Sequence, residues 1–303
     1  MPRIKPKTRR RLATFLITMP FFALVLLFSY GPLFGWSYAF VDYVPGIPVF
    51  KQGFAGLRYF GYILRGMSNL PSVIRNTLVL SLLGMACSPI PVIFAMMLSQ
   101  IRSSRLSKVI QTVSSLPNFI SWVIVYGMAF SFFAMNDGAI NKLLLALHLI
   151  KTPTDLLGNA RFAWYFQTIL GIWKGTGWGA IIYLAAMAGI DPELYDAADV
   201  DGANRLRKIW HITVPGILPT YFVLLLLSIA NMLSNGFEQY FMFQNMLVVD
   251  RLEVLDTFLY RVGIALNLPA YSTAMGICKS LISILLLVIA NQLSRLVRKE
   301  SIL

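Results

Sequence analysis

The sequence predicts an all-α, polytopic membrane protein with six transmembrane helices. The chain has 303 residues, of which 57% are hydrophobic and 13% are charged, a balance too apolar for a soluble protein of this length. The apolar residues form long runs, and most charged residues lie between those runs. No soluble linker or internal repeat separates parts of the chain, so residues 1–303 are expected to form a single membrane domain.

Six apolar runs are long enough to cross a bilayer, which takes about 20 helical residues. They lie near residues 12–40, 76–99, 117–135, 162–190, 217–235 and 274–293. The first run follows a basic start, as in a signal peptide, but it is longer than the apolar core of such a peptide and lacks a small-residue cleavage site. It is therefore expected to stay as the first span. Pro89 and Pro91 predict an interruption of the second span, because proline removes a backbone donor.

The basic residues orient these spans. Segments on the cytoplasmic side of a membrane carry an excess of Lys and Arg. One set of segments, which includes residues 1–11 and 191–216, carries more than half of the 26 basic residues of the chain. Both termini and the loop 191–216 are therefore predicted to be cytoplasmic. The same pattern explains the net charge of +13 without any nucleic-acid partner.

The loop 191–216 is the most polar part of the chain between two spans, and its residues predict a helical hairpin. Asp191 is a good N-cap, and Pro192 suits the first position of a helix. Asp201 and Gly202 then favour a turn, because glycine reaches positive φ without strain. A second helix is expected from about residue 203 to just before the proline at 215, since proline disfavours helical geometry upstream.

This loop resembles the "EAA" loop of the membrane-spanning subunits of ABC importers. The order D-A-A-x-x-D-G-A runs from Asp196 to Ala203, and Ile212 and Pro215 match the Ile-x-x-Pro element that follows. The resemblance implies that the loop forms coupling helices that dock into an ATPase subunit. The positions implied are Leu194, Asp196, Ala197, Ala198, Asp201, Gly202, Ala203 and Pro215. Asp196 stands where the family has Glu. An ordinary capped cytoplasmic hairpin is the alternative interpretation.

The resemblance extends over nearly the whole chain. The stretches LPNFISWVIVYGMAF, IWKGTGWGAIIYLAAMAGIDPELYDAADVDGA and GFEQYFMFQN, with the basic start, look like the sugar permeases of the MalF and LplB types. This resemblance implies the type I ABC importer permease fold in a bacterial cytoplasmic membrane. It also implies a second, homologous permease subunit as heterodimer partner, two ATPase subunits that hold ATP and Mg, and an extracytoplasmic solute-binding protein. The cargo would be an oligosaccharide or a polysaccharide fragment.

Two polar stripes at helical spacing are candidates for the substrate pathway. The fourth predicted span carries Gln167, Lys174 and Trp178 on one face, and Asn231, Asn235 and Glu238 continue a face at the end of the fifth span. Polar side chains in a membrane face partners or a wet cavity, because contact with lipid is costly. The alternative is that these amides and Lys174 only join neighbouring helices. Gly171, Gly175 and Gly179 form a small-residue series that permits close helix contact.

Other classes of function fit less well. A secondary transporter driven by an ion gradient is the alternative transporter, with Lys174 and Glu238 as coupling groups, but no repeat supports it. No nucleophile, base or nucleotide-binding loop indicates an enzyme, so a partner chain would hydrolyse any ATP. The isolated His148, His211, Cys87 and Cys278 show no metal-ligand spacing. The residues alone leave the charge of the saccharide open.

Overall fold

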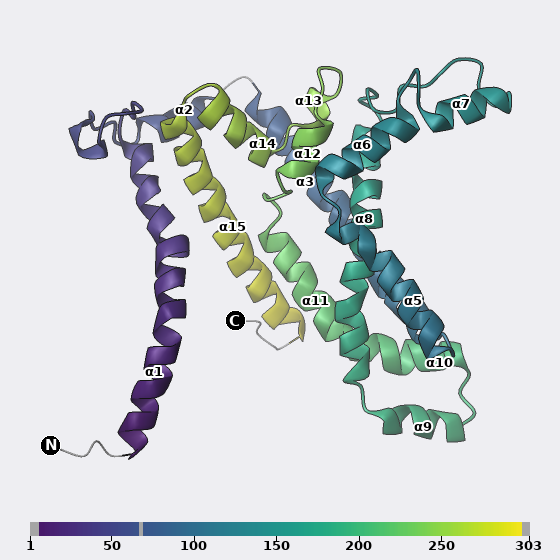
Figure 1. The fold of residues 1–303 in the computed structure, drawn as a ribbon. Coiled ribbons are helices and arrows are strands. Elements are labelled where there is room, and N and C mark those ends of the chain that lie inside the picture. The colour runs from purple at the N-terminus through teal and green to yellow at the C-terminus, as the bar shows by residue number, and fades with distance from the viewer. Residues whose placement is uncertain (1–5, 67–68, 299–303) are drawn as a thin grey trace. The chain divides into compact units, whose positions relative to one another are not determined.

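The computed structural model describes residues 6–66 and 69–298 (Figure 1). Within them the chain is helical apart from turns and loops, and its only β pairing is an isolated bridge between Val41 and Phe54. The chain divides into two compact units, residues 1–67 with 259–279 (unit 1) and residues 68–258 with 280–303 (unit 2). Residues 1–5 of the predicted cytoplasmic N-terminus, and the last residues of the C-terminus, lie outside the described part of the chain.

Several helical segments of the described chain are long and apolar enough to cross a membrane. They are Thr14–Phe40, Leu70–Ser99, Ala163–Ala188, Arg205–Ala230 and Pro269–Gln292. A sixth candidate is the bent pair formed by Ser104–Phe119 and Trp122–Phe133. The all-α, membrane-spanning class predicted from the sequence is therefore confirmed.

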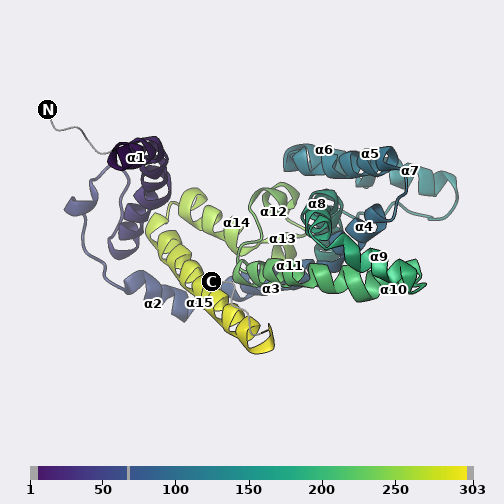
Figure 2. The same ribbon diagram turned by 90° about the horizontal axis from the view of Figure 1, so that it is seen from below.

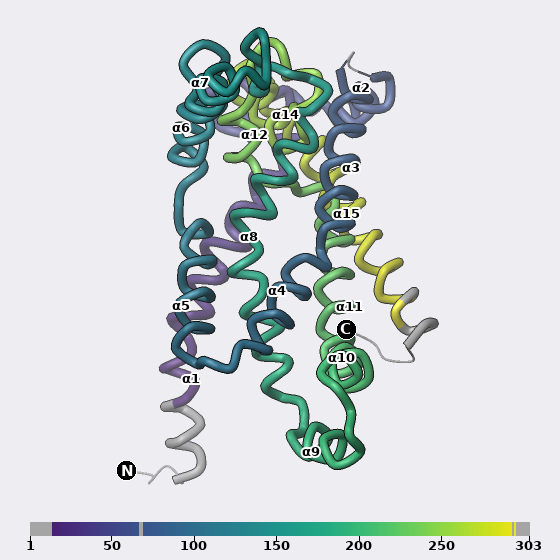
Figure 3. Tube along the Cα trace, turned by 90° about the vertical axis from the view of Figure 1, so that its right-hand side faces the viewer, coloured from purple at the N-terminus to yellow at the C-terminus, as the bar shows by residue number. Residues whose placement is uncertain are grey.

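Unit 2 contains most of the helices. They are α3 (Leu70–Ala86), α4 (Pro89–Ser99), α5 (Ser104–Ser115), η4 (Leu116–Phe119), α6 (Trp122–Phe133), α7 (Ala139–Ala146), α8 (Ala163–Ala188), α9 (Pro192–Val200), α10 (Arg205–Lys208), η5 (Ile209–Thr213), α11 (Val214–Ala230), α12 (Glu238–Phe243) and α13 (Val249–Leu252). Helices α14 (Leu255–Tyr260) and α15 (Pro269–Arg298) each contribute residues to both units. Figure 3 shows α8 running along unit 2, with α7 beyond one end and α9 beyond the other.

The second span is interrupted, as its prolines predict. Helix α3 ends at Ala86, and α4 begins at Pro89 (Figure 3). Prolines at the start of α4 lose no intrahelical hydrogen bond there, because the first N–H groups of a helix have no partner within it. The Ser88 hydroxyl at the break shares a hydrogen bond of 2.9 Å with the Tyr221 hydroxyl of α11.

The third span differs from the single apolar run expected at 117–135. The structure places α5 before it, and the chain bends by 99° between the segments Ser104–Phe119 and Trp122–Phe133. Pro117 is the second residue of the 3-10 turn η4, which directly follows α5. The Ser121 hydroxyl then caps α6 by accepting from the Ile124 N–H at 3.4 Å. The apolar run from 117 onward is thus only the second half of a bent element.

Helix α8 contacts α4 and α5 at very short range through two glycines (the three helices are labelled in Figure 2). A Cβ added at Gly177 would lie 2.0 Å from the Ser114 carbonyl oxygen of α5, and one at Gly179 would lie 3.2 Å from Pro91 of α4. The predicted small-residue series is therefore only partly used for packing. The position of Gly175 faces open space, and the closest approach is made by Gly177, which lies outside that series.

One apolar core of unit 2 joins α6, α8 and the segment around α12 and α13. Val125 and Ala129 of α6 pack with Phe243, Val248 and Leu252. Aromatic contacts of Phe243 with Tyr126 and Phe166 hold the short helix α12 against α6 and α8. This packing fixes the segment that follows the fifth span.

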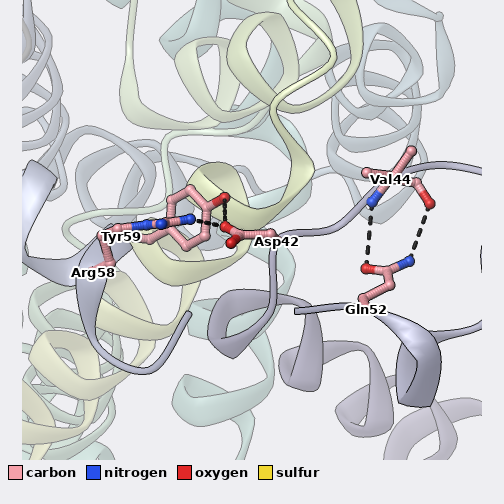
Figure 4. A network of polar contacts seen from close by, with 5 residues as sticks. All are labelled: Asp42, Val44, Gln52, Arg58 and Tyr59. Atoms are coloured by element: carbon pink, nitrogen blue, oxygen red, sulfur yellow. Dashed lines mark hydrogen bonds and ion pairs between the residues drawn. The ribbon is translucent and has the colours of Figure 1, made fainter. Parts of the chain in front are cut away.

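Unit 1 contains α1 (Pro6–Val25), the turns η1 (Leu26–Tyr30), η2 (Gly31–Phe40) and η3 (Val49–Lys51), helix α2 (Arg58–Arg65) and the turn η6 (Arg261–Ala265). Its core gathers Ala39, Ala274 and Ile277. A polar network organises the loop after η2: the Asp42 carboxylate accepts from Arg58 and, at 2.9 Å, from the Tyr59 hydroxyl (Figure 4). Gln52 binds the backbone of Val44 beside it.

Candidate coupling and translocation sites

The hairpin at residues 191–204 has the caps that its sequence predicts. The Asp191 carboxylate accepts from the Glu193 N–H at 3.0 Å and so caps the start of α9. At the other end, Gly202 has φ +70°. Its N–H donates to the Asp199 carbonyl at 3.1 Å, and the Ala203 N–H donates to the Ala198 carbonyl at 2.9 Å. These two bonds form a Schellman motif, which requires a residue in the left-handed region.

The second helix of the hairpin corrects one expectation. It begins after Asn204, whose side chain caps it by accepting from the Arg207 N–H at 2.9 Å. It does not end before Pro215. Instead, the turn η5 is a π-helical turn, and the chain continues as α11 to Ala230. The wider turn accommodates a proline that lacks an N–H, because the Val214 N–H reaches back five residues to the Ile209 carbonyl.

Helix α9 has no fully buried residue, and all of its residues except Tyr195 and Ala198 are exposed. The side chain of Leu194 is 53% exposed, and Ala197 lies on the surface beside it. Asp196 and Asp201 are exposed, while Ala198 and Ala203 are half-buried at the turn. Asp199 pairs with Lys208 across the hairpin, so this carboxylate already has a partner within the chain.

The polar stripe on α8 is divided among different neighbours. Gln167 is buried, and both its backbone carbonyl and its side-chain oxygen accept from Gln239 of α12 at 2.9 Å. Lys174 donates to the Asn118 carbonyl at 2.7 Å and lies 5.4 Å from the centroid of the Trp122 ring. These contacts join α8 to α12 and to the bend of the third span.

Trp178 extends this stripe by one turn and is 48% exposed. Its ring meets the edge of Phe119, with centroids 5.6 Å apart. The contact with η4 adds to that of Lys174, so both residues face the bend between α5 and α6 within unit 2.

The stripe at the end of the fifth span also separates. Asn231 is exposed and donates back to the Leu227 carbonyl at 2.9 Å. Asn235 is half-buried and donates to the Ser81 hydroxyl at 2.8 Å, while its own side-chain oxygen is buried without a hydrogen-bond partner. Glu238 is exposed at the start of α12.

A cavity of about 290 Å³ lies between α3, α4, α8 and α12. Its lining includes Gly171 and Gly175 of α8 together with Ser88 and Tyr240. Burial, with a smaller contribution from Asp256, raises the pKa of Tyr240 to about 12, so its phenol stays neutral at physiological pH. Exposure of the two polar stripes to one common pathway stays a prediction.

Sequence reasoning missed several residues that hold these sites together. Gln239 and Asn118 are the partners of the α8 stripe, and Tyr195 and Thr213 share a hydrogen bond of 3.0 Å beneath α9. Gln239 adjoins Glu238, and a helical-face analysis of α12 would have directed attention to it. Asn118 acts through its backbone carbonyl, which no side-chain pattern can reveal.

The chain matches the family described as "Binding-protein-dependent transport system inner membrane component" over residues 87–299. The match includes the hairpin with its Schellman turn and the continuous helix through Pro215. The chain belongs to this family. It is therefore a multi-pass membrane protein and a permease subunit of an ABC transporter, and it is not itself an enzyme. Membership in this family argues against the alternative interpretation, a secondary transporter driven by an ion gradient.

Relatives match nearly the full length of this permease. It is 37% identical to Protein LplB of Bacillus subtilis over 95% of this chain and 90% of that protein. It is 35% identical to the polygalacturonan/rhamnogalacturonan transport system permease protein YteP of the same organism, over 95% of this chain and 89% of YteP.

Solved structures agree with the sequence relatives. This permease superimposes with a TM-score of 0.85 on a chain of a bacterial ABC transporter involved in the import of the acidic polysaccharide alginate, at 31% identity over 96% of this chain and 98% of that one. A second match has a TM-score of 0.86 and 30% identity over 99% of this chain and 100% of the other. It comes from a bacterial alginate ABC transporter in complex with a periplasmic protein bound to an alginate pentasaccharide.

Proposed function

We propose that this permease forms one half of the translocation pathway of an importer for acidic oligosaccharides. A second, homologous permease subunit would complete the pathway, and two ATPase subunits holding ATP and Mg would drive it. An extracytoplasmic solute-binding protein would deliver the substrate. The full-length similarity to a chain of the alginate importer, crystallised with its loaded periplasmic protein, supports this assembly.

The orientation in the membrane follows from the charge distribution. Both termini and the loop 191–216 are cytoplasmic in this proposal, because the basic residues concentrate in those segments. In unit 2, α9 and α7 lie at opposite ends (Figures 1 and 3). The hairpin is thereby available to an ATPase subunit, and the α7 end to the binding protein.

The coupling role rests on the hairpin. Helix α9 has nine residues, too few to be stable alone in water, and the exposed fraction of its Leu194 side chain is 53%. A cleft in an ATPase subunit would cover this face. The small side chains of Ala197 and Ala198 permit close approach, and the helix after Gly202 runs without interruption into α11.

The observation that supports an acidic substrate is a pair of arginines around one tryptophan. The guanidinium of Arg251 lies 4.6 Å from the centroid of the Trp164 ring, and that of Arg75 lies 5.7 Å from it. These residues come from α13, α8 and α3 and lie in the half of unit 2 away from α9. Guanidinium groups bind carboxylates with two parallel hydrogen bonds, so the carboxylate of a uronic acid would meet this pair of arginines.

The test is uptake by proteoliposomes that contain the complete complex and its binding protein. We expect uptake of trigalacturonate and not of neutral maltotriose. Arg75→Gln combined with Arg251→Gln should lower uptake of the acidic sugar without loss of assembly. Arg161→Gln, which changes an exposed basic residue just before α8, is the matched control. Uptake of maltotriose in place of trigalacturonate would refute the acidic substrate.

A further inference from the structure

A hydrogen bond between two hydroxyls connects the coupling helix directly to the span that follows it. The hydroxyl of Tyr195, in the middle of α9, lies 3.0 Å from the hydroxyl of Thr213. Thr213 is the last residue of the π-helical turn η5 and is only 3% exposed. The contact crosses 18 residues of chain and bypasses the turn at Gly202.

The other link across the hairpin is weaker. Asp199 and Lys208 form an ion pair, but the side chain of Asp199 is 62% exposed. Exposed ion pairs are screened by solvent and contribute little to holding two elements together. The Tyr195 hydroxyl is partly buried and directional, so it constrains the position of α9 relative to α11 more strongly.

The surroundings of the contact leave α9 room to move. A cavity of about 420 Å³ is bordered by Tyr195 and Thr213 and by the ends of α4 and α8. Packed cores resist gradual deformation, so open space beside an element lets it shift without overpacking its neighbours.

A close contact follows Thr213 by one helical turn. A Cβ added at Gly216 would lie 2.5 Å from the Ile190 side chain, which sits between α8 and α9. The start of α11 is therefore held against the end of α8 at Gly216. A displacement applied at Thr213 acts beside this fixed point and would tilt α11 rather than translate it.

We propose that the Tyr195–Thr213 hydroxyl pair passes movement of α9 to α11, with the π-helical turn as the deformable element. Single π-helical turns within α-helices are frequent at functional sites. Tyr195 and Thr213 are positioning residues in this scheme, since neither touches substrate or nucleotide. The inference rests on the proposed docking of α9 to an ATPase subunit.

The test measures a distance within the complete complex. Spin labels at Ile182 of α8 and Leu227 of α11, whose side chains are 43% and 44% exposed, report tilt of α11 when ATP is added. The measured distances would fall into two populations, one without and one with the ATP-induced tilt. In Tyr195→Phe, the equilibrium constant in favour of the tilted population should fall about twofold to tenfold, the range expected for one lost hydrogen bond. Thr213→Val should lower this constant by a similar factor, and the double variant Tyr195→Phe with Thr213→Val should lower it no further. Thr213→Ser keeps a hydroxyl and should keep the wild-type response.

The matched control is Tyr221→Phe, which removes a hydroxyl pair with Ser88 of nearly the same length, away from the hairpin. It should leave the ATP response as in the wild type. A wild-type response in Tyr195→Phe would overturn the proposal. Loss of the ATPase subunit from that variant would overturn it too, because the contact would then only hold the hairpin together. An unchanged distance in the wild-type complex would instead refute ATP-driven movement of α11.

Discussion

Replacing Gly202 by valine tests whether the turn of the coupling hairpin is set by backbone conformation alone. Gly202 has φ +70°, and a Cβ added there would meet nothing within 4 Å. A Cβ therefore causes no clash within the chain, and the main expected penalty is backbone strain. The substitution therefore tests the backbone conformation of the turn separately from its side-chain packing.

The penalty follows from general values. An L-residue in the left-handed region is destabilised by roughly 1–2 kcal/mol. Loss of the chain entropy of glycine in the unfolded state offsets about 0.4–1 kcal/mol of this. The net cost is about 1 kcal/mol, which lowers the population of the docking-competent hairpin about fivefold. Asparagine tolerates this region better, so Gly202→Asn should fall between wild type and Gly202→Val.

The assay is dilution of the purified complex, with the concentration at which half of the ATPase subunit dissociates as the readout. Gly202→Val should dissociate at about fivefold higher concentration than wild type. Gly61→Val in α2 is the control, because its position is also open but lacks a positive φ. Equal dissociation of Gly202→Val and wild type would refute the role assigned to the turn.

Three further predictions concern orientation, docking and the pathway. Cysteine introduced at Arg205 should resist a membrane-impermeant thiol reagent in intact cells while cysteine at Lys142 reacts, and the reverse order would overturn the proposed orientation. Ala198→Trp should abolish ATPase co-purification by overpacking the α9 surface, and wild-type recovery would leave the loop as an ordinary hairpin. Alanine at Asn231 or Asn235 should reduce uptake several-fold with assembly intact, whereas normal transport would assign these amides to helix packing alone.

Local sequence signals predicted the hairpin well because its geometry depends on neighbours in the chain. Asp191 caps α9 through a hydrogen bond to a residue two positions away. The positive φ of Gly202 is possible without strain because glycine has no side chain. Both effects act within one turn of helix, so a single stretch of sequence contains all the information that they need.

The course of the chain through prolines was harder to predict. Pro215 was expected to end a helix, but a π-helical turn carries the helix past it. Pro117 was placed at the start of a span, yet it lies before a 99° bend within a longer element. The position of a proline in the sequence identifies which backbone hydrogen bond is lost. Packing against other helices decides whether the chain stops, bends or widens in response.

The sequence by itself determined the class of the fold, the apolar runs and the positions of the polar stripes, because hydrophobicity and helical period are properties of the chain. Only the tertiary structure decided which neighbours those stripes meet. Gln167 contacts Gln239, which lies 72 residues later, and Tyr195 meets Thr213 across the hairpin. Such pairings depend on the packing of separate helices, and a periodic pattern defines a face without defining what covers it.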